Sequence, residues 1–314
     1  MPSTAYSAER GAPAGAQRLP PTGYVLLCAL TLFWGLNWPT AKIALGEIPV
    51  WTFRSLCLIV GGLGILAIVR LNGRSLRVPT DEIRPLLLCS LLNVVGWHLF
   101  SAYGVSLIEA GRASIIAFTM PVWAAVLSWF VLGERLTLSS VLGLALGVLG
   151  LAVLVGPDLA SLGSAPLGSF CMLGAAISWA AGTVFMKRFR WSISMGALAG
   201  WQLSAGAVPV VLGALILEPA FNPAEISFEV WLALAYILAF PMIFCHWAWF
   251  SIVRLFPAAI AAAGTLAIPV VGVLSGAIIL GESVGWREFL ALALVCGALT
   301  GVLVVPALKQ APRS

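Results

Sequence analysis

The sequence predicts an all-α polytopic membrane protein with ten transmembrane helices, arranged as two inverted five-helix repeats. Three observations predict this fold class: the balance of apolar and charged residues, ten apolar runs of spanning length, and a motif that recurs at a fixed offset. Hydrophobic residues make up 61% of the 314-residue chain and charged residues 9%, whereas a soluble domain carries roughly 25% charge. So little charge does not cover a water-facing surface, so most of the surface must face lipid.

The charge and cysteine patterns exclude several other classes. The net charge of +5 is spread along the chain, so we expect no nucleic-acid partner. All six cysteines lie in apolar runs and none forms a CxxC pair, which argues against a disulfide framework or a zinc site. The sequence contains no HExxH, GxSxG or Walker A motif. We therefore expect no enzyme activity, no catalytic residues, no metal and no cofactor.

Ten apolar runs are long enough to cross a bilayer, because a hydrocarbon core of about 30 Å needs about 20 helical residues. These runs occupy residues 23–44, 48–70, 85–106, 111–132, 138–156, 166–187, 194–217, 229–253, 257–280 and 288–307. Helices are the expected form, because alternation with a period of two is absent and lipid leaves no backbone group unpaired.

The distribution of Lys and Arg predicts the orientation of the chain. With the N-terminus in the cytoplasm, the opposite side keeps only Lys42, Arg54, Arg112 and Arg287. That bias is what the positive-inside rule expects when both termini are cytoplasmic. We expect residues 1–22, which are polar and rich in Ala, Pro and Gly, to form a disordered cytoplasmic tail, and residues 309–314 to form a second one.

A repeat relates the two halves of the chain. The motif Pro…Leu-Gly-Glu, which begins at Pro121, recurs at Pro269, and the offset is 148. Four further pairs recur at an offset of 148 or 145: Arg54 and Gln202, His98 and His246, Trp34 and Trp179, and Lys42 and Lys187. The repeats are predicted at residues 23–157 and 158–308. Because five is odd, the second half must lie upside down relative to the first, and inverted repeats are typical of secondary transporters with a substrate site near the midplane.

This pattern resembles the EamA-type families of the drug/metabolite transporter superfamily. Each five-helix unit has a Trp in its first helix, an Arg or Gln early in its second, and the Pro…Leu-Gly-Glu motif in its fourth. The resemblance covers about residues 20–308, and the abundance of Trp is similar to that of the bacterial aromatic amino acid exporters. It implies alternating access, outward movement of metabolites and a multi-pass location in the bacterial inner membrane.

Acidic residues are absent from the middle of every predicted span. Each Asp and Glu after the tail lies at a predicted helix end or in a loop. A buried carboxylate is the natural partner of a permanent cation or a transported proton. Its absence argues against a pump for quaternary ammonium compounds and against proton coupling through a carboxylate.

Polar and aromatic side chains within the spans are the candidate substrate-binding residues. His98 and His246 are the only ionisable groups deep in their spans, and such groups are functional candidates. The full candidate set is Trp34, Asn37, Trp38, Trp97, His98, Ser101, Tyr103, Trp179, Trp201, Gln202, His246 and Trp247. The alternative for each is ordinary packing, a neutral imidazole bonded to a carbonyl, or a hydrogen bond between helices.

Two basic residues, Arg54 and Lys42, lie near the predicted outer mouth. Either side chain can meet a substrate carboxylate, but we favour extension of both to the lipid headgroups. A GxxxG pair at Gly143 and Gly147 allows close helix contact, and we favour a contact within the fold over a dimer interface. We therefore expect a monomer, with a dimer as the alternative.

The expected function is secondary export of amino acids, aromatic or other bulky neutral ones, because a pocket lined by indole rings suits a flat, partly apolar solute. The expected partners are this small-molecule substrate and the lipid bilayer. The alternatives are an exporter of another metabolite or drug, an intramembrane enzyme, and a channel.

Overall fold

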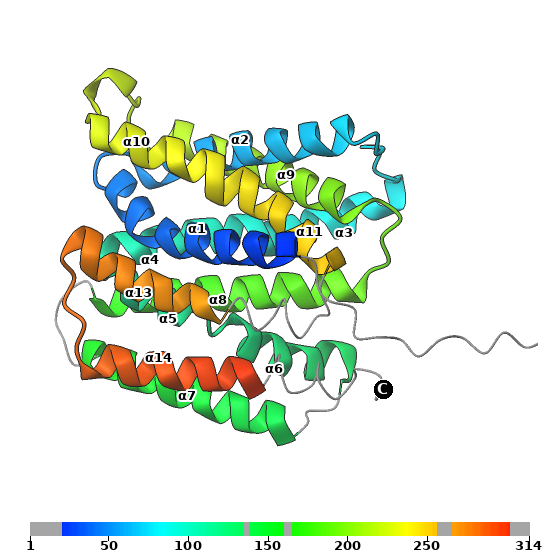
Figure 1. The fold of residues 1–314 in the computed structure, drawn as a ribbon. Coiled ribbons are helices and arrows are strands. Elements are labelled where there is room, and N and C mark those ends of the chain that lie inside the picture. The colour runs from blue at the N-terminus through cyan, green and yellow to red at the C-terminus, as the bar shows by residue number, and fades with distance from the viewer. Residues whose placement is uncertain (1–20, 135–137, 160–164, 256–265, 302–314) are drawn as a thin grey trace, which may run out of the picture.

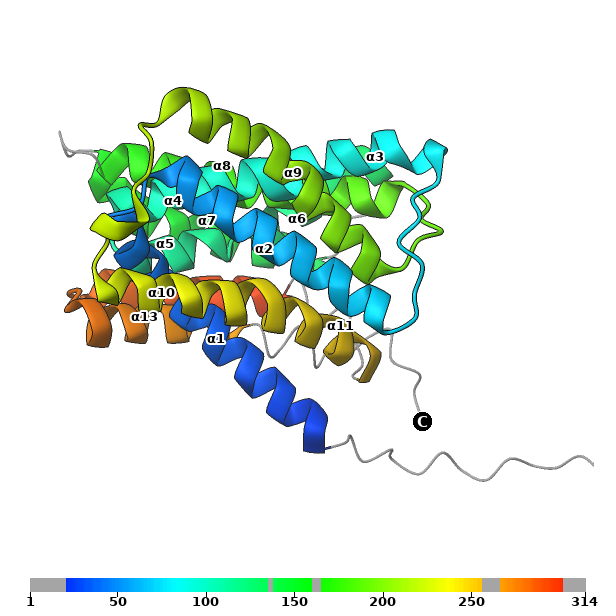
Figure 2. The same ribbon diagram turned by 90° about the horizontal axis from the view of Figure 1, so that it is seen from above.

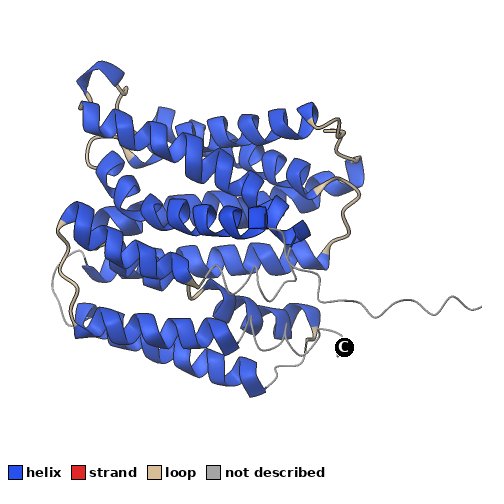
Figure 3. Ribbon diagram, in the orientation of Figure 1, coloured by secondary structure: helices blue, strands red, loops and turns tan. Residues whose placement is uncertain are grey.

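The structure, a computed structural model, describes residues 21–134, 138–159, 165–255 and 266–301. Within these ranges every regular element is helical and no strand occurs (Figure 3). The tails predicted at 1–22 and 309–314 lie outside the described residues, except that Pro21 and Thr22 belong to the first helix.

The helices follow the predicted spans closely. The first half comprises α1 (Pro21–Leu45), α2 (Val50–Leu71), α3 (Thr80–Ser90), the π-helical turn η1 (Leu91–Gly96), α4 (Trp97–Leu107), α5 (Ala110–Ala117), α6 (Met120–Leu132) and α7 (Leu138–Leu159). The second half comprises α8 (Ala165–Arg188), α9 (Met195–Leu217), the 3₁₀ turn η2 (Pro223–Glu225), α10 (Phe228–Ile237), the π-helical turn η3 (Leu238–Phe244), α11 (Cys245–Leu255), α13 (Ala267–Leu280) and α14 (Trp286–Leu299).

Seven helical segments of the described residues are long and apolar enough to cross a membrane. They are Thr22–Leu45, Val50–Leu71, Thr80–Leu107, Ala110–Leu132, Pro166–Arg188, Met195–Leu217 and Phe228–Trp249. Shorter apolar helices at Val141–Leu154 and Ala267–Leu280 fall in the predicted fifth and ninth spans. Parts of the predicted ninth and tenth spans, residues 257–265 and 302–307, lie outside the described residues. The protein is therefore a multi-pass helical membrane protein.

Among the described residues, the third and eighth spans each contain a π-helical turn in mid-span that was not predicted from the sequence. The turn η1 interrupts the helix of α3 and α4, and η3 interrupts the helix of α10 and α11. The two turns begin 147 positions apart, which is within one residue of the sequence repeat. Pro241 lies inside η3 and has no backbone N–H, so the regular hydrogen-bond ladder is broken there. Single π-helical turns inside α-helices occur frequently at functional sites.

The predicted span 111–132 is broken into α5 and α6 by a turn at Phe118 and Thr119. Pro121 explains the break, because its missing N–H leaves the carbonyl of Ala117 without its helical partner. The Thr119 hydroxyl donates to the carbonyl of Ile116 at 2.6 Å and so holds the turn. This interruption lies beside α13, the helix that begins near the second copy of the proline.

The helices run side by side in one bundle, with α7 and α14 together along one edge (Figures 1 and 2). Within the bundle α2 packs along α9, α4 along α8, and α1 along α13. Gly147 of the predicted GxxxG pair makes a close contact inside the fold, because a Cβ there would meet Val122 of α6 at 2.9 Å. On the same helix, a Cβ on Gly150 would meet the Ala291 carbonyl of α14 at 3.2 Å.

The bundle has two ends, and contacts between loops define them. We call the end where α1 begins and α2 finishes the near end, and the end where α1 finishes the far end. At the near end Glu82 accepts a hydrogen bond from the backbone N of Ser192, which follows α8, at 2.7 Å. At the far end Glu47, which follows α1, accepts one from the backbone N of Ser227 at 2.7 Å. Helices α1 and α8 therefore finish at opposite ends of the bundle.

Candidate functional site

A buried polar cluster lies between α2 and α4. Arg54 of α2 is only 5% exposed, and its Nη2 donates to Ser101 Oγ of α4 at 3.1 Å. The guanidinium carbon lies 4.9 Å from the centre of the Phe53 ring. The Nε atom is buried without a hydrogen-bond partner. Among the described residues, no carboxylate forms an ion pair with Arg54.

The prediction that Arg54 extends to the lipid headgroups is wrong. Its neighbours Phe53, Ser55, Cys57 and Leu58 are also buried, so this part of α2 is enclosed by protein and gives the side chain no route to the headgroups. Arg54 is thus a functional candidate that the predicted site omitted. The sequence did carry a signal for including Arg54 in the site: the repeat pairs it with Gln202, which the predicted site included.

His98 lies one helical turn from Ser101, whose hydroxyl donates to the His98 carbonyl at 3.3 Å. The imidazole is 7% exposed and its Nδ1 has no hydrogen-bond partner. Arg54 and Ser101 are thus in direct contact, and His98 lies one helical turn from Ser101 on α4. Arg54 Nε and His98 Nδ1 are both buried without a hydrogen-bond partner.

The second histidine has the structural partner that we weighed as the alternative. His246 Nδ1 lies 3.0 Å from the carbonyl oxygen of Pro241, in the π-helical turn η3. Its ring packs edge-to-face against Trp34 of α1, with centroids 6.0 Å apart, and Trp34 also contacts Trp249 at 6.2 Å. A matching contact joins Trp97 of α4 to Trp179 of α8, which is the repeat counterpart of Trp34.

The tryptophans that the repeat pairs with each other make equivalent contacts. Trp34 of α1 packs on aromatic rings of α11, and Trp179 of α8 packs on Trp97 of α4 with centroids 5.1 Å apart. The first and sixth spans thus contact the eighth and third spans in matching ways. Trp97 directly precedes His98 in the sequence, and Trp34 contacts the ring of His246.

An amide pair occupies the contact between η1 and α9. Asn93 Nδ2 and Gln202 Oε1 are 3.5 Å apart, and both amides approach the sulfur of Met186. Ser90 Oγ donates to the backbone carbonyl of Gln202 at 2.6 Å. Both amides are buried, and Asn93 Oδ1 has no hydrogen-bond partner. Gln202 therefore ties the second half of the chain to the π-helical turn of the first half.

Several predicted site residues lie away from this interior. Tyr103 is 38% exposed and its hydroxyl accepts a hydrogen bond from Trp51 Nε1 at 2.9 Å. Trp247 is also exposed, and Trp201 Nε1 donates to the carbonyl of Leu76 in the near-end loop. Two remaining residues are on α1: Trp38 is buried and Asn37 is half-buried.

Charged side chains close the far end. Glu282 Oε1 accepts hydrogen bonds from Lys42 Nζ at 3.0 Å and from the backbone N of Ala110 at 2.7 Å, and its Oε2 accepts one from the backbone N of Gly111 at 3.0 Å. Lys42 also donates to the carbonyl of Ile108 at 2.7 Å. Glu282 thereby caps the N-terminus of α5, where a carboxylate is favoured by the helix dipole. Lys42 is therefore paired and does not extend freely to headgroups.

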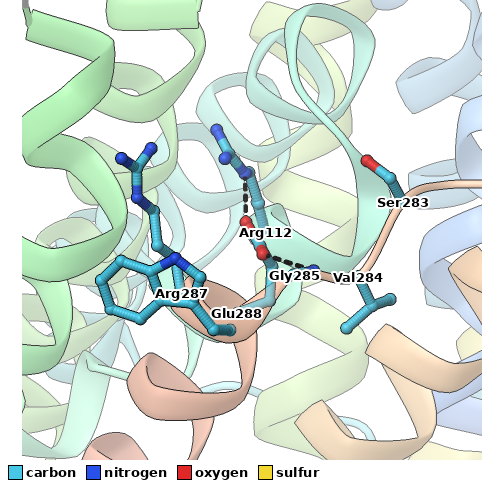
Figure 4. Close-up of a pocket in the computed structure, with 7 residues that line it drawn as sticks. Arg112, Ser283, Val284, Gly285, Arg287 and Glu288 are labelled. Carbon is cyan, nitrogen blue, oxygen red and sulfur yellow. Dashed lines mark hydrogen bonds and ion pairs between the residues drawn. The ribbon is translucent and has the colours of Figure 1, made fainter.

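A second ion pair lies beside the first. Arg112 Nε donates to Glu288 Oε1 at 2.9 Å, and Glu288 Oε2 accepts from the backbone N of Gly285 at 2.9 Å (Figure 4). These residues line a hollow of about 300 Å³. A neighbouring hollow of about 330 Å³ is lined by Lys42, Glu109 and Arg112, among others. Partial burial raises the pKa of Glu109, and the nearby carboxylates of Glu282 and Glu288 add to this rise, while Arg112 opposes it.

The near end carries the repeat counterpart of the far-end pair. Lys187, in the last turn of α8, pairs with Glu134, which follows α6. Both glutamates follow a glycine in the left-handed conformation, Gly133 with φ 69° and Gly281 with φ 66°. These are positions that favour glycine because a Cβ is strained there. In each case the glutamate N–H closes the helix end at 3.3 Å, on Ser128 and on Gly276 respectively.

The two pairs differ in exposure. The side chains of Lys42 and Glu282 are 30% and 9% exposed, whereas those of Lys187 and Glu134 are 63% and 46% exposed. The far-end pair is thus the more enclosed of the two and is supported by two backbone amides, while the near-end pair is open to solvent. The sequence repeat relates these four residues in pairs, but no role was predicted from it for the two glutamates. The signal was the recurrence of Lys and Glu at the ends of matched helices.

A match to a family model identifies the family. The EamA-like transporter family matches residues 21–156 and, a second time, residues 166–304. The chain belongs to the EamA-like transporter family. It is therefore a transporter and not an enzyme. A solved crystal structure has a similar fold, with a TM-score of 0.65 and 22% identity over 92% of this chain and 99% of that chain.

Curated relatives of this EamA-like transporter span nearly its whole length. The transporter YvbV of Bacillus subtilis (strain 168) is 31% identical over 305 residues, which cover 95% of this chain and 96% of the relative. The transporter YoaV of the same strain is 27% identical over 271 residues, 86% of this chain and 92% of the relative. A Salmonella typhimurium protein named a probable amino-acid metabolite efflux pump is 26% identical over 285 residues, 88% of this chain and 93% of the relative.

Proposed function

We propose that this EamA-like transporter exports amino acids, aromatic or other bulky neutral ones, by alternating access. The ten spans form two inverted five-helix halves, residues 23–157 and 158–308, with the substrate path between them. The double match to the family and the two π-helical turns at matched positions support this division. The name of the Salmonella relative and the ring pairs around Trp34 and Trp179 support the substrate class.

The observation that carries the mechanism is the matched pair of ion pairs at opposite ends. Lys42 and Glu282 join α1 to the end of α13 at the far end, and their counterparts Lys187 and Glu134 join α8 to the end of α6 at the near end. An alternating-access transporter opens one end while the other is closed, so it needs closing contacts at both ends. The enclosed far-end pair and the exposed near-end pair favour a state that is closed at the far end.

The orientation follows from the distribution of basic residues. The near end faces the cytoplasm, both termini are cytoplasmic, and the protein lies in the bacterial inner membrane. In this orientation the enclosed far-end pair closes the outer side, so the state is one that receives a solute from the cytoplasm. The working unit is a monomer in the lipid bilayer, and it needs no cofactor.

Counterflow in proteoliposomes tests the function. Vesicles preloaded with unlabelled tryptophan should accumulate labelled tryptophan with saturable kinetics, and external phenylalanine and tyrosine should inhibit this uptake. The measurement is repeated across all twenty amino acids at two pH values. The absence of saturable counterflow for every amino acid would contradict the substrate class, and flux that rises linearly with concentration would indicate a channel.

A further inference from the structure

The interior of the bundle contains a cation without a counterion. Arg54 is enclosed on α2, and its Nη2 donates to the hydroxyl of Ser101. Its Nε donor is unused. Burying an unpaired charge is costly, because the lost hydration is not replaced by an opposite charge. A side chain of this kind inside a membrane bundle indicates a ligand that supplies the missing anion.

The geometry points to Arg54 as the receptor for a carboxylate of the transported solute, with Ser101 and His98 as its partners. This inference rests on the proposed function only in requiring that the solute pass through the bundle. A guanidinium presents five N–H donors in a planar fork, which matches the two oxygens of a carboxylate. Ser101 occupies one donor from the side of α4, and the Nε donor stays available for the solute.

His98 completes the site from the same helix as Ser101. Its Nδ1 is buried without a hydrogen-bond partner, one helical turn from Ser101. A neutral imidazole beside Arg54 adds a hydrogen bond without adding charge. The preceding residue, Trp97, packs against the ring of Trp179 on α8. The solute's carboxylate is thus held by α2 and α4, and an apolar side chain extends toward these rings.

Only the first half of the repeat carries a cation at this position. The counterpart of Arg54 is Gln202, a neutral amide that is bonded within the contact between η1 and α9. The second half therefore offers no matching cation, and the interior holds one anionic group per transported solute. Among the described residues, the acids lie at helix ends or in loops, so organic cations find no counterion in the interior.

The test compares carboxylates with their amides on purified protein. Isothermal titration calorimetry with L-tryptophan, 3-phenylpropanoate and the amide of each gives the preference for the charged group. We expect each acid to bind about 10- to 100-fold more tightly than its amide, which is the range expected for hydrogen bonds to a charged group. Arg54→Gln should abolish this preference, and Arg54→Lys should reduce it about tenfold, because an ammonium keeps the charge and loses the fork.

Arg70→Gln is the matched control. Arg70 lies at the exposed end of the same helix, so the same substitution there should leave the preference for acids unchanged. Binding of acid and amide with equal affinity, retention of the preference in Arg54→Gln, or no binding of either acid would overturn the inference. An Arg54-dependent preference for 3-phenylpropanoate without amino acid counterflow would uphold the site and reject the proposed amino acid substrate.

Discussion

Replacing Glu282 with glutamine tests how the far end is closed. The carboxylate accepts three hydrogen bonds, from Lys42 Nζ and from the backbone amides of Ala110 and Gly111. Glutamine keeps one acceptor oxygen and turns its amide group, a donor, toward other donors. The substitution should therefore destabilise the state that is closed at the far end and leave the far-end-open state largely unaffected, because these contacts form only when the end is closed.

The magnitude follows from the exposure of the partners. A hydrogen bond to a charged group contributes about 1.5–3 kcal/mol, and the partly exposed ion pair with Lys42 adds about 1 kcal/mol or less. A net loss of about 2 kcal/mol corresponds to a shift of roughly 30-fold in the ratio of open to closed states. Even half of this loss gives a fivefold shift, which a labelling rate resolves.

The assay is the labelling rate of a cysteine placed behind the far-end pair. Ser114 of α5 is fully buried, one turn beyond the capped amides. Ser114→Cys in a chain whose six native cysteines are replaced should react with an impermeant maleimide, added from the far side, only when the far end opens. Glu282→Gln should raise this rate about 5- to 30-fold. Glu229 is an exposed acid at the same end, and Glu229→Gln should not change the rate. An unchanged rate in Glu282→Gln would refute the closing role of this residue.

Three further substitutions test the packing and the extent of the site. Gly182→Ala should lower the thermal unfolding midpoint by the equivalent of about 1–3 kcal/mol, because the new Cβ would lie 2.9 Å from the backbone N of Asn93. Gly174→Ala on the same helix is the control: its Cβ would meet its nearest atom at 3.4 Å, so the midpoint should stay unchanged. Glu218→Ala removes a carboxylate that accepts hydrogen bonds from two backbone N–H groups and one hydroxyl at the start of α2, so the unfolding midpoint should fall by the equivalent of about 2 kcal/mol. An unchanged midpoint would show that water replaces these hydrogen bonds. Tyr103→Phe removes one hydrogen bond at the exposed surface and should leave the KM for counterflow within twofold of the parent; a tenfold rise would place Tyr103 in the substrate path.

The helical architecture was predictable from the sequence because span length and apolar composition depend on the bilayer alone. The first five predicted spans start and finish within a few residues of the helices, and α3 begins earlier, at Thr80. The π-helical turns and the break before α6 were not predicted. Pro241 and Pro121 marked two of these irregular places, but a proline in a spanning helix is often accommodated without a break, as Pro39 is in α1.

The candidate site was predictable in part. The repeat pairs identified His98, Gln202 and Trp179, and all three lie in the interior. Arg54 was misjudged because its place five residues into α2 suggested the headgroup region, and the direction of a side chain around the helix depends on packing against other helices. The sequence supplied depth along the helix, but only the structure shows which face of α2 is enclosed.

The most direct test of alternating access is the effect of the near-end pair on the far-end probe. Glu134→Gln weakens the pair with Lys187, which is exposed and so contributes about 1 kcal/mol or less. If opening of one end excludes opening of the other, labelling of Ser114→Cys from the far side should fall by about two- to fivefold, opposite in sign to the effect of Glu282→Gln. A rate that rises, or that stays equal to the parent, would contradict reciprocal opening of the two ends.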